Sequence, residues 1–267
     1  MAHVAEFAVV DPSAELADDV VVGPFCVIGP DVTIGPGTRL ENNVTIERNA
    51  RIGANNHFFP GVVIAGAPQD LSYNGTDTQT MIGDNNVFRE GVTVNRASEK
   101  EDGITSIGSN CFIMACAHVA HDCKIGNHVV MANATLLGGH VHVHDHATIS
   151  GAVAIHQFNT VGQFSFIGGL SRVIHDVPPF MLVDGNPARP RCINIVALKR
   201  NDFPAEDISA LADAHRLIYR AKVGLEHARD ILHGNNQITP SVNHLLRFVQ
   251  TQQDGRHGRS RDIRRAA

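Results

Sequence analysis

The clearest pattern in this chain of 267 residues lies between Ile107 and Val173, where the sequence reads IGSNCFIMACAHVAHDCKIGNHVVMANATLLGGHVHVHDHATISGAVAIHQFNTVGQFSFIGGLSRV. Every sixth residue of this segment is large and apolar: Ile107, Ile113, Val119, Ile125, Met131, Leu137, Val143, Ile149, Ile155, Val161, Ile167 and Val173. The column four residues later holds only small or medium-sized residues, such as Cys111, Ala117 and Ser171. A fixed short period of this kind indicates a repeat architecture.

The same apolar column runs in steps of six from Val10 to Ile64, and again from Ile82 to Val94. Gly often follows the large residue, which suits a backbone that turns with positive φ or closely approaches a neighbour. A six-residue unit fits one short strand plus a turn, and three units form a coil of about 18 residues that stacks at the strand spacing. We therefore predict an all-β parallel β-helix of roughly eight coils. Cys26, Cys111 and Cys123 fall in the small inward column, and we expect them to be packing residues.

Two interruptions and a change of period divide the chain. Residues 65–81 keep the register but place polar residues in the apolar column, so they form either a loop or a polar coil. Residues 97–106 break the register and predict a second loop. We assign the β-helix to 1–190. Apolar spacings of three, four and seven predict one helix over 204–232 and a shorter one over 241–250, within a C-terminal helical domain of 191–252. The basic residues 253–267 predict a disordered tail.

Composition narrows the class of protein. Apolar residues make up 43% and charged residues 18%, with a net charge of −5, so a buried core is expected and nucleic acid is not an expected partner. No run of about 18 apolar residues and no secretory signal is present, so we predict no transmembrane segment. An odd number of cysteines favours a reducing compartment, and we expect a cytoplasmic protein.

The repeat also places the histidines in space, because residues separated by one full coil should lie one above the other. His121 then lies beside Gly139 and Gln157, Asp122 beside His140, and Gly138 beside His156. His121 is a candidate general base, and the bare backbone N–H of Gly139 is a candidate oxyanion donor. Asp122 would either set the tautomer of His121 or cap a turn. The alternative is that these histidines are polar surface residues at turns, and those of 142–146 are expected to be solvated or to trap a stray metal.

Six motifs resemble a known family: HVAHDC (118–123), APQDLSY (67–73), AIHQF (154–158), DVPPF (176–180), NIVALKR (194–200) and LIYR (217–220). They are similar to those of the UDP-N-acetylglucosamine O-acyltransferases, hexapeptide-repeat acyltransferases that catalyse the first step of lipid A biosynthesis. The resemblance implies a left-handed β-helix, although crossover sterics alone favour the right hand. It implies no cofactor, a homotrimer with sites between subunits, and transfer of an R-3-hydroxyacyl chain from acyl carrier protein to the 3-hydroxyl of UDP-N-acetylglucosamine.

The resemblance also implies roles for individual residues. His121 would be the general base, Asp122 would orient it, and Gly139 would bind the oxyanion. Gly169 matches a position that measures the length of the acyl chain. The implied substrate contacts are Asp70, His118, His140, His156, Gln157, Asn194 and Arg200.

Four positions depart from the family pattern, namely Ser72, Asn95, Val196 and Asn201, and the last two would touch the nucleotide. An aminated or different nucleotide sugar therefore remains an alternative acceptor, as does a non-catalytic sugar-nucleotide-binding paralogue. A third class is a zinc hydratase on the same fold. It requires two histidines five apart, whereas His118 and His121 are three apart, so we predict no metal site.

Overall fold

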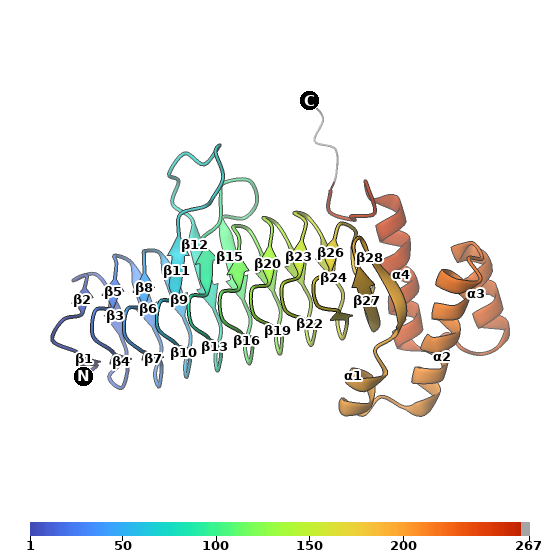
Figure 1. Ribbon diagram of the computed structural model, residues 1–267, viewed down its shortest axis with the longest axis horizontal. Helices are drawn as coiled ribbons and strands as arrows, with labels where there is room; N and C mark the ends of the chain where they lie inside the picture. Colours follow the sequence, from blue (N-terminus) through green and yellow to red (C-terminus); the bar gives the residue numbers. More distant parts are fainter. Residues whose placement is uncertain (263–267) are drawn as a thin grey trace.

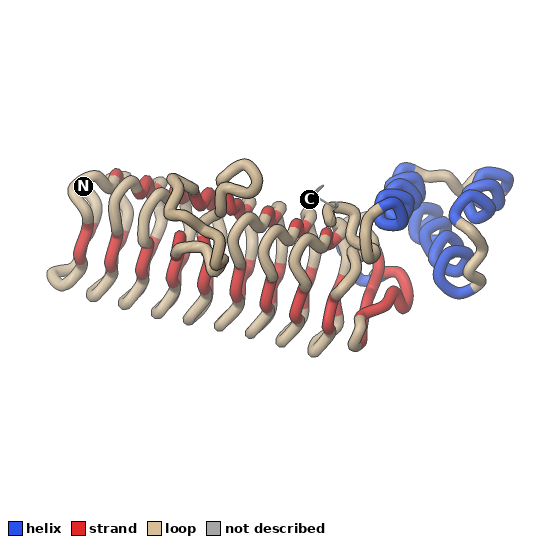
Figure 2. Tube along the Cα trace, turned by 90° about the horizontal axis from the view of Figure 1, so that it is seen from above, coloured by secondary structure: helices blue, strands red, loops and turns tan. Residues whose placement is uncertain are grey.

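The structure, a computed structural model that describes residues 1–262, is a three-sided prism of stacked coils with a helical domain at one end (Figures 1 and 2). The predicted parallel β-helix is confirmed. Each side of the prism is one sheet, and the chain passes from sheet A to sheet B to sheet C in every coil. We call the corners that it turns the A–B, B–C and C–A edges.

Sheet A has eleven strands, of which only the last pair is antiparallel: β1 (His3–Val4), β4 (Val21–Val22), β7 (Arg39–Leu40), β10 (His57–Phe58), β13 (Val87–Phe88), β16 (Phe112–Ile113), β19 (Val130–Met131), β22 (Thr148–Ile149), β25 (Phe166–Ile167), β27 (Met181–Gly185) and β28 (Ala188–Ile193). Sheet B has nine: β2 (Val9–Val10), β5 (Val27–Ile28), β8 (Thr45–Ile46), β11 (Val63–Gly66), β14 (Thr93–Asn95), β17 (His118–Val119), β20 (Leu136–Leu137), β23 (Ala154–Ile155) and β26 (Arg172–Val173). Sheet C has eight: β3 (Glu15–Leu16), β6 (Val32–Ile34), β9 (Ala50–Ile52), β12 (Gln79–Ile82), β15 (Ile104–Ile107), β18 (Lys124–Ile125), β21 (His142–Val143) and β24 (Thr160–Val161).

The predicted columns form the core. Residues one coil apart pair in adjacent strands, as Val119 does with Leu137 and Leu137 with Ile155. The large column is almost wholly buried, and so are Cys26, Cys111 and Cys123, as their packing role requires. Each coil buries its apolar face only against its neighbours, so the stack is cooperative.

The glycines that follow the large apolar residue do not have a positive φ. They allow the backbones of adjacent coils to approach each other closely. A Cβ on Gly29 would lie 1.6 Å from the carbonyl oxygen of Glu47 in the next coil. The left-handed backbone conformation falls instead on turn residues such as Asn43 (φ 57°), Asp122 (φ 61°) and His140 (φ 63°). Asn, Asp and His tolerate this region better than most side chains.

Both loops leave the prism at the B–C edge, between β11 and β12 and between β14 and β15 (Figure 1). Ile64 pairs with Ile46 of the preceding regular coil, but on its other side it pairs with Val94 and not with Ile82, which continues the six-residue column. The first insertion is therefore an excursion from the stack, and no polar coil forms there. Ile82 pairs with Ile107 of the next coil. The second loop lies within the coil that joins these two residues, and its extra residues explain why the six-residue register is lost there.

The helical domain comprises α1 (Ile195–Arg200), α2 (Ala205–His215), the π-helix η1 (Arg216–Arg220), α3 (Leu225–Gly234) and α4 (Pro240–Asp254). The single helix predicted over 204–232 is wrong, because the chain breaks at 221–224. Lys222 has a φ of 54°, and Gly224, a poor helix former, caps α3 in an extended conformation. The second helix is longer than predicted, with Thr239 as N-cap and Pro240 at its first position. Within residues 1–262, none of the helices combines the length and hydropathy that a bilayer span requires.

The predicted disordered tail is also wrong as far as residue 262. After α4, residues 255–262 turn back and pack along the B–C edge, where Asp176 N–H donates to Gly258 O over 2.8 Å. Ser260 N–H donates to the Asp176 carboxylate over 2.7 Å, and Arg259 donates to Ile174 O over 3.1 Å. These hydrogen bonds supply the order that charge composition alone did not suggest. Residues 263–267 of the predicted tail lie outside the described part of the chain.

Candidate active site

The turns of the B–C edge bring the predicted catalytic residues together. His121 and Asp122 lie in the turn between β17 and β18, and Gly139 and His140 lie in the turn directly above it. The backbone N–H of His140 donates to His121 O over 3.0 Å. The residues that the coil period predicts to be neighbours are therefore side by side in the structure.

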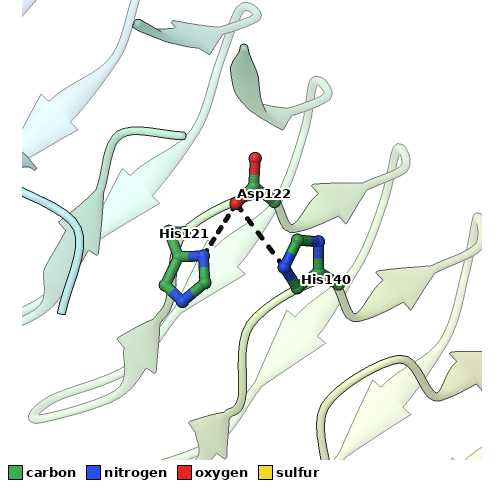
Figure 3. A group of neighbouring side chains, drawn as sticks. All are labelled: His121, Asp122 and His140. Atoms are coloured by element: carbon green, nitrogen blue, oxygen red, sulfur yellow. Dashed lines mark hydrogen bonds and ion pairs between the residues drawn. The ribbon is translucent and has the colours of Figure 1, made fainter. Parts of the chain in front are cut away.

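His121 is oriented by Asp122. Its ring Nδ1 lies 2.7 Å from Asp122 Oδ2. Figure 3 marks this contact with a dashed line. Asp122 is fully buried and accepts two further hydrogen bonds from Ser98, from the hydroxyl at 2.7 Å and from the backbone N–H at 3.1 Å. Because a carboxylate only accepts, the proton of the first pair lies on Nδ1, which leaves Nε2 of neutral His121 with a lone pair. Such an imidazole is prepared to accept a proton.

The ring of His121 lies against the backbone of Gly139. A Cβ added to Gly139 would be 2.6 Å from Cε1 and 2.7 Å from Nε2 of His121, so any other residue would displace the ring. The N–H groups on either side of Gly139 are occupied, since Gly138 donates to Ile155 O and His140 to His121 O. The N–H of Gly139 makes no hydrogen bond among residues 1–262. A free backbone donor beside a free imidazole nitrogen is the arrangement that acyl transfer requires.

His140 packs beside this pair and is only 3% exposed. Its ring stacks on Phe158 with centroids 4.4 Å apart and meets the His121 ring edge-on at 5.2 Å. Nδ1 lies 3.0 Å from Glu101 Oε1, and Nε2 lies 3.8 Å from Asp122 Oδ2. The predicted contact between His140 and substrate stays a prediction, and the burial favours support of the His121–Asp122 pair.

Burial and hydrogen bonding set the charges of this cluster. Burial works to raise the pKa of the Asp122 carboxyl, but hydrogen bonds from His121 and Ser98 outweigh it and hold the pKa below its usual value, so Asp122 is ionised. Burial lowers the pKa of His118, and the neighbouring His121 adds to this. Burial also lowers the pKa of His140, against the opposing charges of Asp122 and Glu101, so the neutral ring is favoured at pH 7.

The two loops reach the same cluster from outside. Lys100 pairs with Asp70 and so ties the second loop to the first. Lys100 also donates its backbone N–H to Ser98 Oγ, the group that holds Asp122. The hydrogen bonds from Lys100 and Ser72 hold the pKa of Asp70 well below its ordinary value. Asp70 is thus an anion in the first loop, and Ser72 donates its hydroxyl and its backbone N–H to the Asp70 carboxylate.

The remaining predicted residues are spread over the prism. His118 lies in β17 with its Nδ1 2.8 Å from Thr93 Oγ1, and the departure Asn95 donates to Ala67 O at the base of the first loop. His156 and Gln157 are exposed in the B–C turn after β23. Gly169 is exposed at the A–B edge.

Asn194 and Arg200 lie at a different corner. Together with Val196 and Asn201 they line a cavity of about 370 Å³ that also contacts His128 and His146 of the C–A edge. Asn194 caps α1 and donates to Phe164 O, so its side chain is held in place, while Arg200 is exposed. One chain therefore carries predicted site residues on all three edges of the prism: His121 at the B–C edge, Gly169 at the A–B edge, and Asn194 with Arg200 beside the C–A edge.

His121, Asp122 and His140 also form a geometric group that could hold a metal ion, with ligand atoms within 4.8 Å of one another. The donor set fits such an ion poorly, because the Asp122 carboxylate already accepts hydrogen bonds from His121 and from Ser98.

Sequence reasoning missed Ser98, Glu101 and Arg261. All three come from segments without the six-residue period, so no column places them. For Ser98 and Glu101 the signal was the interruption itself, since a loop that leaves a rigid stack often carries function, and Arg261 had no such signal.

Comparisons with known proteins agree with the fold and the motifs. Residues 176–258 match the family model described as "Udp N-acetylglucosamine O-acyltransferase; Domain 2", and residues 13–48 and 104–139 match "Bacterial transferase hexapeptide (six repeats)". The acyl-(acyl-carrier-protein)–UDP-N-acetylglucosamine O-acyltransferase of Thermodesulfovibrio yellowstonii is 46% identical over 96% of this chain and 99% of the relative. The protein of that name from Syntrophobacter fumaroxidans is 45% identical over 93% of this chain and 96% of the relative.

Solved structures give the same result. The UDP-N-acetylglucosamine acyltransferase of Francisella novicida superposes with a TM-score of 0.88 at 38% identity, covering 94% of this chain and 91% of that one. The Arabidopsis enzyme superposes with a TM-score of 0.81 at 34% identity, covering 92% and 96%. The chain belongs to the UDP-N-acetylglucosamine O-acyltransferase family of hexapeptide-repeat acyltransferases, and its fold is a left-handed parallel β-helix followed by a small C-terminal helical domain.

Proposed function

We propose that this chain transfers an R-3-hydroxyacyl group from acyl carrier protein to the 3-hydroxyl of UDP-N-acetylglucosamine, the first step of lipid A biosynthesis, with His121 as general base. The observation that carries the proposal is the contact between the His121 ring and Gly139, with Asp122 holding Nδ1. The names of the relatives supply the substrates.

The reaction needs one base and one oxyanion donor. Nε2 of His121 takes the proton of the acceptor hydroxyl while its oxygen attacks the thioester carbonyl carbon. The negative charge that develops on the carbonyl oxygen is stabilised by the N–H of Gly139. The intermediate collapses as the carbon–sulfur bond breaks, and the imidazolium returns its proton to the departing thiolate. The ionised Asp122 stabilises the transient charge on His121.

The site is completed by a second copy of the chain. Asn194 and Arg200 lie at the C–A edge and Gly169 at the A–B edge, whereas His121 lies at the B–C edge. Residues on different sides of a rigid prism can meet in one cleft only when protomers pack side by side. A closed trimer satisfies this requirement with three equivalent clefts. We place the protein in the cytoplasm, in keeping with its five free cysteines.

The direct test is an assay of purified protein with UDP-N-acetylglucosamine and R-3-hydroxyacyl carrier proteins of several chain lengths. We expect an O-acylated nucleotide sugar and free carrier thiol in equal amounts. Nucleotide-sugar binding without acyl transfer would favour the non-catalytic paralogue and contradict the proposal.

An altered acceptor is the second candidate, because Val196 and Asn201 line the cavity in which Arg200 lies. Val196 is 59% exposed there and offers no polar group to a ligand. A competition assay between UDP-N-acetylglucosamine and its 3-amino analogue distinguishes the two acceptors. Preference for the amine would mean that the same base and oxyanion donor serve an amine acceptor and that the product is an N-acyl sugar.

A further inference from the structure

The C-terminal strap, residues Gly255–Asp262, ends beside the catalytic turns. Arg261 donates through Nη1 to the carbonyl oxygen of His140 and through Nη2 to Glu101 Oε1, over 2.9 Å in the second case. Glu101 belongs to the loop between β14 and β15 and is 160 residues away in sequence. The strap and the loop therefore meet over a single residue, His140.

Glu101 and Arg261 together specify where the proton of His140 lies. The same Glu101 oxygen that accepts from Arg261 lies 3.0 Å from Nδ1 of His140. A carboxylate cannot donate, so the close contact requires a proton on Nδ1. In the neutral ring, Nε2 then carries a lone pair and points toward Asp122 Oδ2 at 3.8 Å. His140 in this tautomer donates nothing to Asp122.

The opposite tautomer would interfere with the base. A proton on Nε2 of His140 would be drawn toward Asp122 Oδ2, now 3.8 Å away, and a small closing movement would make it a further donor to the oxygen that already accepts from Ser98 Oγ and from Nδ1 of His121. His140 would then compete with His121 for this oxygen, and the His121 ring would lose part of the constraint that keeps it over Gly139. Small displacements of a catalytic group are costly in rate.

We propose that Glu101 and Arg261 are positioning residues that hold the proton of His140 on Nδ1 and thereby keep His140 from competing with His121 for Asp122. This rests on the proposed function of His121 as general base. The strap is suited to the task because it is anchored independently, by His257 O to His175, by Ser260 to Asp176 and by Arg259 to Ile174. Arg261 is thus delivered by a segment that is itself fixed to the prism.

The test combines a spectroscopic and a kinetic measurement on the full chain. Nitrogen NMR of ¹⁵N-histidine-labelled protein reports the tautomer of each ring, and a His140→Asn variant assigns the signal. We expect an Nδ1–H ring in the wild type and an Nε2–H or mixed ring in Glu101→Ala and Arg261→Met. In both variants kcat should fall about tenfold with KM nearly unchanged, because the effect acts on the base and not on substrate contacts.

Two further variants sharpen the result. Glu101→Gln keeps an oxygen that can accept from Nδ1, and it should restore the tautomer and most of kcat. Arg256→Met removes an equal charge from an exposed position in the same strap and should match the wild type in both measurements.

An unchanged His140 tautomer in Glu101→Ala overturns the inference, whether or not kcat falls, because a fall alone would indicate a loss of stability. Absence of acyl transfer in the wild type would instead overturn the proposed function. The NMR measurement would still decide the tautomer in that case.

Discussion

The B–C and C–A edges of the same prism are built in opposite ways. At the B–C edge, Asp122 is fully buried, His140 is 3% exposed, and two loops and the C-terminal strap cover the turns. At the C–A edge the rings of His128, His146 and Phe164 stack at centroid distances of 4.7 and 4.6 Å beside an open cavity and the exposed Arg200. The first edge holds charged groups rigidly, as a base and its orienting partner require. The second presents an open surface on which aromatic and aliphatic groups lie beside polar ones such as Arg200, which suits it to binding.

The same repeat generates both edges, so the difference lies in what the turns carry and what covers them. A turn in a β-helix is a scaffold position that recurs with the six-residue period, and its side chain is free to vary. Under the proposed function, the base and the nucleotide contacts lie on different corners of a rigid stack, so a cleft that combines them needs two protomers.

The largest expected effect comes from removing the base. His121→Ala should lower kcat/KM by about 10²–10⁴-fold, because no general base is then left to take the proton of the sugar hydroxyl. The matched control is His57→Ala, which removes another histidine paired to a carboxylate, Glu41 at 2.7 Å, from sheet A. Steady-state kinetics and sedimentation of both variants separate loss of chemistry from loss of the fold. Activity of His121→Ala near that of the wild type would remove the mechanism.

The second effect concerns the fit between ring and backbone. Gly139→Ala places a methyl group 2.6–2.7 Å from His121 Cε1 and Nε2, so the ring must move. We expect kcat to fall by about 10²-fold, as a displacement near 1 Å can cause. Gly151→Ala at the A–B edge meets its nearest atom, Asn133 O, at 3.4 Å and should change kcat much less. Equal effects of the two substitutions would show that Gly139 is an ordinary turn glycine.

A third experiment asks whether the two edges meet between protomers. Arg200→Ala should raise KM for the nucleotide sugar about tenfold by removing one charged contact. Refolded or co-expressed mixtures of His121→Ala and Arg200→Ala chains should contain intact clefts at about a quarter of the interfaces, each with His121 from one chain and Arg200 from the other. Recovery beyond the mean of the two parents supports a shared site. No recovery would mean that each chain acts alone.

The smallest expected effect is on the free energy of unfolding, and it comes from His142, which lies in sheet C between the two edges. Burial, with a contribution from the charge of Arg261, lowers the pKa of His142 to about 3, against about 6.5 in the unfolded chain. Between these values the unfolded state binds a proton that the folded state does not, so stability falls as the pH falls from about 6.5 toward 3. At neutral pH both states are neutral and the group contributes nothing.

His142→Gln should therefore lose less stability than the wild type between pH 7 and pH 5. Urea unfolding midpoints at several pH values provide the measurement. If the urea midpoints of the two proteins changed with pH in parallel, the lowered pKa of His142 would be contradicted.

Much of the B–C edge could be predicted because the period converts sequence distance into spatial distance. His121, Gly139 and Gln157 follow one another at intervals of one coil and stack for that reason alone. The loops were detectable as failures of the same period. The helical domain was harder, since apolar spacing ran through the break at 221–224, where a positive φ at Lys222 and the flexible Gly224 end the helix.

The amino-acid sequence by itself determined the stacked coils, the inward columns and the contact between an imidazole and a bare backbone, because each follows from local periodicity and from strand pairing between adjacent turns. Only the tertiary structure decided that Ser98 holds Asp122, that Glu101 and Arg261 meet over His140, and that the basic C-terminal segment is ordered as far as residue 262. These contacts join non-periodic segments up to 160 residues apart, and their geometry depends on how loops fold onto a surface that must first exist.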